Sequence, residues 1–252
     1  MRKGTIFKYE MKRLFFSKEY LLLLVATLVY GISLLRSMVL YGTNYTAPFS
    51  QLTFSTYCSS LTPFLLILLL ALCRRQSRAS ELRAEAIVGA TPIPLPVFRL
   101  LRCAAAACAF LVAAALPVSA CFLFYRTVFG DMLFTAYPTL LPLLWTALLL
   151  LLPPAILLFG AAMLFRTRRR TAFSILLTVI LVLGIFRLTL PDFTDILGSS
   201  AVSVPVAEEY TLPGMYEFTY SSAFIASRVV FSFAGIVLIL LSLHPSGRKT
   251  AA

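Results

Sequence analysis

Long apolar runs separated by short polar segments constrain this chain more than any other feature of its sequence. Of the 252 residues, 60% are hydrophobic and 13% are charged, about half the charged share of a soluble domain. A membrane-spanning helix needs about 20 mostly apolar residues, and several such runs are visible. We therefore expect an all-α, polytopic membrane protein with a single transmembrane domain over residues 1–252. The predicted spans cover residues 20–40, 56–72, 103–125, 137–165, 171–186 and 222–243.

The distribution of charge predicts how these spans are oriented. The net charge of +12 could suit nucleic-acid binding, but 18 of the 22 lysines and arginines lie in the segments on one side of the spans. Six of the ten acids lie on the other side. The positive-inside rule then puts both termini and loop 73–102 in the cytoplasm, and loop 187–221 outside the cell. We expect no nucleic-acid partner.

Residues 1–19 predict an amphipathic helix that lies on the inner leaflet. Apolar residues at roughly helical spacing form one face, and basic residues form the opposite face, as in helices that bind anionic lipid surfaces. A secretory signal peptide is the alternative interpretation, but the basic region is long and no A-x-A-like site follows. The residues expected to contact lipid headgroups are Lys8, Lys12, Arg13 and Lys18.

Loop 73–102 predicts a short helix over residues 77–88, followed by a proline-rich return to the membrane. Glu81 and Glu85 lie four residues apart on one face, and Leu82 and Ala86 mark another face. A short helix held between two spans has a suitable shape for contacting another protein. The alternative is a solvated loop that only connects the spans.

Motifs of known enzyme classes are absent from the sequence. It contains no Walker lysine motif, H-E-x-x-H, G-x-S-x-G or G-x-G-x-x-G. The apolar centres of the spans carry no acid and no histidine, so we expect no catalytic residue. His244 is the single histidine, and the five cysteines lie in or beside apolar runs. We therefore expect no metal site and interpret the cysteines as small buried hydrophobic residues.

Arg228 is the one ionisable residue expected well inside a span. It lies about six residues into the last run, roughly 9 Å along a helix. An unpaired charge at that depth is costly, so the side chain should face protein or a water-filled cavity. It could contact an anionic substrate or lipid headgroup. Snorkelling, or an ion pair with an outer-loop acid such as Glu217, is the favoured alternative.

The order of these parts resembles the permease subunit of type-two ABC exporters, the membrane half of a bacterial ABC transporter. The resemblance covers the whole chain in layout and two stretches in sequence detail. KYEMKRLFFSKEYLLLL is similar to the family's opening, where a basic interface helix runs into the first span. ELRAEAIVGATPIPLPVFRLLR is similar to the family's loop between spans two and three.

This resemblance implies a function and a set of partners. Residues 77–88 would be a cytoplasmic coupling helix that contacts a separate ABC ATPase subunit. ATP and Mg²⁺ would bind to that subunit, and this chain would bind no cofactor. A second permease would complete a homodimer or heterodimer in the bacterial cytoplasmic membrane, and loop 187–221 would carry short re-entrant helices. The residues implied at the ATPase contact are Arg78, Glu81, Leu82, Glu85 and Ala86.

Two other functions compete with ATP-driven export. The first is a non-transport membrane protein, such as an accessory or immunity factor that binds a partner. The second is a proton- or sodium-driven carrier, which is disfavoured because the spans lack carboxylates and no internal repeat is evident.

Overall fold

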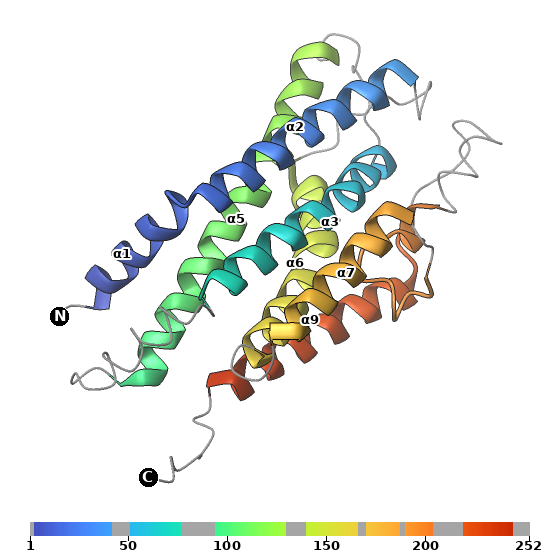
Figure 1. The fold of residues 1–252 in the computed structure, drawn as a ribbon. Helices are drawn as coiled ribbons and strands as arrows, with labels where there is room; N and C mark the ends of the chain where they lie inside the picture. Colours follow the sequence, from blue (N-terminus) through green and yellow to red (C-terminus); the bar gives the residue numbers. More distant parts are fainter. Residues whose placement is uncertain are drawn as a thin grey trace.

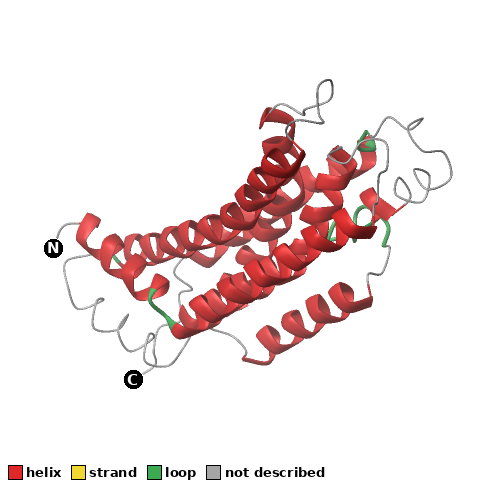
Figure 2. Cartoon of the chain, turned by 90° about the horizontal axis from the view of Figure 1, so that it is seen from above, coloured by secondary structure: helices red, strands yellow, loops and turns green. Residues whose placement is uncertain are grey.

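The structure, a computed structural model, describes residues 3–41, 51–76, 94–129, 140–165, 170–186, 190–203 and 219–243. Over these ranges the chain is helical and contains no strand (Figure 2), which confirms the all-α class. The helices are α1 (Lys3–Phe15), α2 (Lys18–Tyr41), α3 (Gln51–Gln76), α5 (Leu95–Phe129), α6 (Leu140–Phe165), α7 (Arg170–Phe186) and α9 (Ser222–Leu243).

Among the described residues, five helices are long and apolar enough to cross a membrane, which fits a multi-pass membrane protein. They are α2, α3, α5, α6 and α9. The remaining predicted span, residues 171–186, corresponds to α7, whose apolar part, Ser174–Phe186, is shorter than these five. At about 1.5 Å per residue, the 17 residues of α7 extend about 25 Å, a little less than the hydrocarbon core of a bilayer. A membrane span at residues 171–186 therefore stays a prediction.

Both ends of predicted loop 73–102 are helical in the structure. Helix α3 continues through Arg74 and Arg75 to Gln76, because polar residues with good helix propensity prolong it beyond its apolar part. Helix α5 begins eight residues before the predicted span. The carbonyl of Pro94 accepts hydrogen bonds from the backbone N–H groups of Val97 and Phe98, and Pro96 lies in the first turn, where no N–H is needed.

Two helices form the inside of the bundle and the others surround them (Figure 1). In the apolar parts of α3 and α6, 61% and 67% of the residues are buried. In α2, α5 and α9 the corresponding share is 22% to 33%. Helix α3 packs against α2, α5, α6 and α7, while α6 packs mainly against α9 and α3. The outer helices expose large apolar side chains, such as Leu22 and Phe233. An apolar exterior around a buried core suits a lipid environment.

Helices α6 and α9 approach each other closely at two glycines. A Cβ atom on Gly160 would lie 2.5 Å from the carbonyl oxygen of Gly235. A Cβ atom on Gly235 would lie 2.6 Å from the backbone of Ile156 and Leu157. Small residues at a crossing let two backbones come into contact, as is common between membrane helices. The α6–α9 pair is therefore packed backbone to backbone.

Candidate functional site

A cavity of about 310 Å³ lies between α2, α3, α7 and the 190–203 segment. Its volume is at the lower end of the range that small-molecule sites occupy. Tyr30 of α2 and Phe64 of α3 stack at 4.1 Å between ring centroids and form one wall. On α7, Gly184 leaves room for Pro63 of α3, because a Cβ atom there would lie 2.8 Å from the proline ring.

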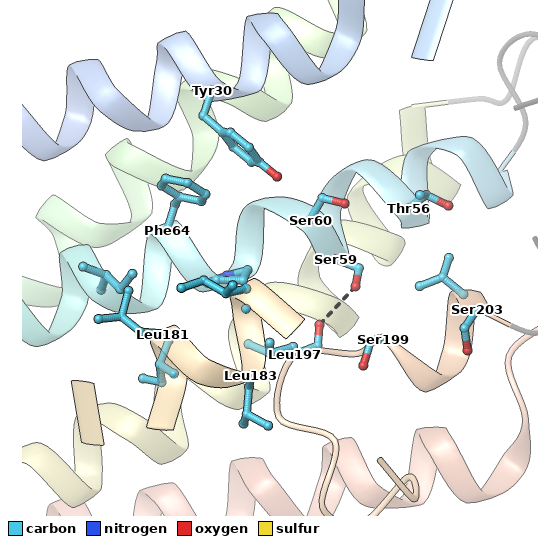
Figure 3. A pocket seen from close by; sticks show the side chains of 16 residues that line it. Tyr30, Thr56, Ser59, Ser60, Phe64, Leu181, Leu183, Leu197, Ser199 and Ser203 are labelled. Atoms are coloured by element: carbon cyan, nitrogen blue, oxygen red, sulfur yellow. Dashed lines mark hydrogen bonds between the residues drawn. The ribbon is translucent and has the colours of Figure 1, made fainter. Parts of the chain in front are cut away.

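The two ends of this cavity differ in chemistry (Figure 3). Tyr30, Phe64 and Leu181 make one end aromatic and aliphatic. At the other end the Ser59 hydroxyl donates a hydrogen bond to the carbonyl of Leu197, 3.3 Å away. The cavity can therefore hold an amphipathic molecule, with most of the hydrogen-bonding groups at one end and the Tyr30 hydroxyl directed toward them. The hydroxyl side chains gathered at this end are those of Thr56, Ser59, Ser60, Ser199 and Ser203.

The 190–203 segment, which borders the hydroxyl end, is organised by a buried carboxylate. Asp195 is 1% exposed and accepts hydrogen bonds from the backbone N–H groups of Gly198 and Ser200, at 3.0 and 2.6 Å. It also accepts bonds from the hydroxyls of Ser199 and Ser200. These bonds fix the start of the helical residues 200–203. The segment is thereby held as a compact turn.

Arg228 of α9 attaches this segment to the helix bundle. Its guanidinium donates to the carbonyl oxygens of Asp195 and Ile196, at 2.8 and 3.4 Å. The cation also lies over the rings of Phe224 and Phe231, with the guanidinium carbon 4.3 and 5.3 Å from the ring centroids. Arg228 is 1% exposed, so protein encloses the guanidinium and it does not extend to the surface.

Gly198 permits this contact. Its φ of +76° is a backbone conformation that side-chain-bearing residues rarely adopt. A Cβ atom at Gly198 would also lie 2.7 Å from Leu150 of α6 and 3.3 Å from the Arg228 guanidinium. Glycine at position 198 therefore allows the segment to pack closely against α6 and α9.

Tyr220 ties the beginning of α9 to α3. Its hydroxyl lies 2.7 Å from the Ser55 hydroxyl, and its ring stacks on Phe224. Burial raises the pKa of Tyr220 to about 12, so the phenol is neutral at physiological pH and can both donate and accept a hydrogen bond. Tyr220 therefore attaches α9 to α3, while Arg228 attaches α9 to the 190–203 segment.

A second buried polar cluster joins α1, α3 and α5 at the end of the bundle where loop 73–102 begins and ends. Gln76 and Arg102 each donate to the other's backbone carbonyl, at 3.0 and 3.3 Å. The Glu10 carboxylate lies 3.9 Å from the Arg102 Nε and 2.6 Å from an Arg13 nitrogen. Arg102 is fully buried, although it was predicted within the loop. This cluster holds the two ends of the loop together.

The structure describes some of the sequence-predicted site residues and leaves others outside its ranges. Lys8, Lys12 and Lys18 are exposed, whereas Arg13 turns inward to Glu10. Glu217 and the predicted 77–88 helix lie outside the described residues. The predicted ATPase contacts therefore also lie outside them, namely Arg78, Glu81, Leu82, Glu85 and Ala86.

Sequence reasoning missed Glu10 and Asp195, although each leaves a signal. Glu10 lies midway between Ile6 and Leu14 at a spacing of four, which puts a carboxylate on the apolar face of α1. Asp195 precedes a Gly-Ser-Ser sequence, a pattern that favours capping of a short turn. The cavity leaves no comparable signal, because its hydroxyls come from segments far apart in the chain.

Comparison of the chain with family models, with curated proteins and with solved structures finds no match. Over the residues that the structure describes, no group of three histidine, cysteine or acidic side chains is arranged to hold a metal ion. The class that the fold defines is thus a multi-pass, all-helical membrane protein with an amphipathic cavity.

Proposed function

We propose that this chain is the permease subunit of an ABC exporter in the bacterial cytoplasmic membrane. In this proposal α7 also spans the membrane, both termini are cytoplasmic and α1 lies at the inner membrane surface. A separate ATPase subunit binds ATP and Mg²⁺, and a second permease completes the dimer. The observation that carries the proposal is the cavity between α2, α3 and α7, which borders the 190–203 segment.

The cavity has the chemistry expected of a site for an amphipathic substrate. Its aromatic and aliphatic end suits an apolar group, while its hydroxyl end can exchange hydrogen bonds with a polar group. The described lining residues carry no charge. A substrate could therefore leave the site without breaking an ion pair, which suits transport better than tight retention.

The buried cluster of Glu10, Gln76 and Arg102 supports the coupling part of the proposal. It holds α1 and both ends of loop 73–102 in one unit. A force applied to that loop by a bound ATPase would therefore reach α3 and α5 directly. Helix α3 also lines the cavity, so the same helix connects the loop with the site.

The test is purification of the full chain from its native membranes, followed by a search for an ATP-hydrolysing partner. Glu81→Lys combined with Glu85→Lys should reduce recovery of the ATPase or uncouple its hydrolysis from transport. A buried charged contact that loses one partner typically costs about 2–5 kcal/mol. The matched control is Glu208→Lys with Glu209→Lys, the same charge change in the predicted extracellular loop, which should leave ATPase recovery unchanged.

Two outcomes would contradict the proposal. One is that no ATPase accompanies the wild-type chain, which would favour the accessory or immunity protein. The other is that the two double reversals have equal effects, because the predicted loop helix would then have no special role.

A further inference from the structure

We propose that a basic groove between the start of α2 and the end of α3 binds the headgroup of an anionic phospholipid, with preference for a headgroup that carries two phosphates. The groove has a volume of about 470 Å³. It is separate from the cavity between α2, α3 and α7, and it does not depend on ATP-driven transport. Helices α2 and α3 run side by side in opposite directions (Figure 1), so the first turn of one lies beside the last turn of the other.

The charges that line the groove favour a phosphate ligand. Lys18 of α2 and two arginines of α3, Arg74 and Arg75, contribute three positive charges. Glu19 contributes one negative charge, which leaves a net charge of +2. Arginine forks and lysine ammonium groups both bind phosphate oxygens through charge-assisted hydrogen bonds. The groove's net charge of +2 matches a headgroup with two phosphates, such as that of cardiolipin, better than a headgroup with one phosphate.

The contact between the acid in the groove and Arg75 is weak. An Arg75 nitrogen lies 4.0 Å from the Glu19 carboxylate, at the limit of an ion pair, and the two side chains are 22% and 46% exposed. Ion pairs that are long and open to solvent contribute little to stability. A phosphate that approaches Arg75 therefore competes with a weak contact rather than with a strong one.

The apolar surface beside the groove selects a lipid over a free phosphate. Leu22 lines the groove, is 69% exposed and begins a stripe that continues along α2. Val25, Val29 and Ile32 follow at helical spacing and are each more than half exposed. Acyl chains attached to a headgroup in the groove would lie along this stripe. Basic pockets between membrane helices at the cytoplasmic surface are a known means of binding anionic lipid headgroups.

Native mass spectrometry of the full chain in detergent tests this site, with cardiolipin, phosphatidylglycerol or phosphatidylcholine added. We expect one tightly retained cardiolipin, weaker retention of phosphatidylglycerol and none of phosphatidylcholine. Removal of one cation near a membrane surface should weaken binding about fivefold. Lys18→Gln combined with Arg75→Gln should thus weaken cardiolipin binding roughly 30-fold. Glu19→Gln should strengthen it about fivefold, because it removes the competing carboxylate.

Arg36→Gln is the matched control, since Arg36 is an exposed arginine near the opposite end of α2. It should change the affinity by less than about twofold. Equal weakening by Arg36→Gln and Arg75→Gln would overturn the site, because surface charge alone would then explain binding. Displacement of the lipid by millimolar inorganic phosphate would overturn the choice of lipid. If the double variant does not fold, two single variants test the groove instead. Arg75→Lys should still bind cardiolipin, and Glu19→Gln should bind it more tightly. An unchanged cardiolipin affinity in Glu19→Gln contradicts the proposal.

Discussion

At the scale of single residues, Arg228 is the side chain whose loss should change the 190–203 segment most. Arg228→Ala removes the donors to a buried and a part-buried backbone carbonyl, and an unpaired buried carbonyl costs about 1–3 kcal/mol. We expect a lower thermal midpoint in detergent and exposure of a thiol introduced at the buried position Val202→Cys. Arg228→Lys should protect that thiol only in part, because an ammonium group lacks the planar fork and stacks less well on the aromatic rings.

The control for this prediction is Arg36→Ala, which removes an exposed arginine and should change neither the thermal midpoint nor the reactivity of the thiol. Four of the five native cysteines are buried and should react slowly with a thiol reagent. Replacing half-buried Cys108 should therefore leave little labelling except at the introduced thiol. A thiol at position 202 that stays protected in Arg228→Ala would show that other contacts hold the segment.

At the scale of helices, the contact between α6 and α9 should tolerate even one added methyl group poorly. In Gly160→Ala the new Cβ atom would lie 2.5 Å from the Gly235 carbonyl, so the helices must move apart. Overpacking of this kind typically costs about 1–3 kcal/mol. We expect Gly160→Ala and Gly235→Ala each to lower the thermal midpoint in detergent. Gly4→Ala is the control, because open space surrounds that position, and an equal loss in all three variants would contradict the prediction.

Helix bounds show what hydropathy can and cannot predict. The predicted span 222–243 coincides with α9, because polar residues follow the apolar run closely at its end. Helices α3 and α5 extend past their predicted spans because Arg74, Gln76 and Leu95–Arg102 are compatible with helix although they are not part of an apolar run. Hydropathy marks the apolar part of a helix, whereas backbone hydrogen bonding and capping decide where the helix ends.

The candidate sites were less predictable than the helices. The depth of Arg228 could be read from the sequence, but its partners are backbone carbonyls, which every residue carries. Burial of Arg102 likewise depends on α1 packing beside α5, and this packing brings Glu10 to it. Such contacts join segments distant in the chain, and periodicity within one segment holds no information about them.

At the scale of the whole molecule, the predicted orientation can be tested by labelling from one side of the membrane. A thiol at Thr194→Cys, an exposed position after α7, should react with an impermeant reagent applied outside intact cells. Thiols at Lys8→Cys and Arg168→Cys should react only after permeabilisation, because their segments carry the basic residues that stay inside. Equal access to Arg168→Cys and Thr194→Cys would mean that α7 does not cross the membrane.

The glycine contact between α6 and α9 also limits the order in which the protein can be assembled during synthesis. Helix α6 leaves the ribosome before α7, the 190–203 segment and α9, yet it packs most extensively against α9. Until α9 is inserted, the backbone around Gly160 has no partner in the bundle and must be covered by lipid or by the insertion machinery. Completion of the fold therefore waits for α9, and intermediates that stall before it should be the substrates of membrane quality-control proteases.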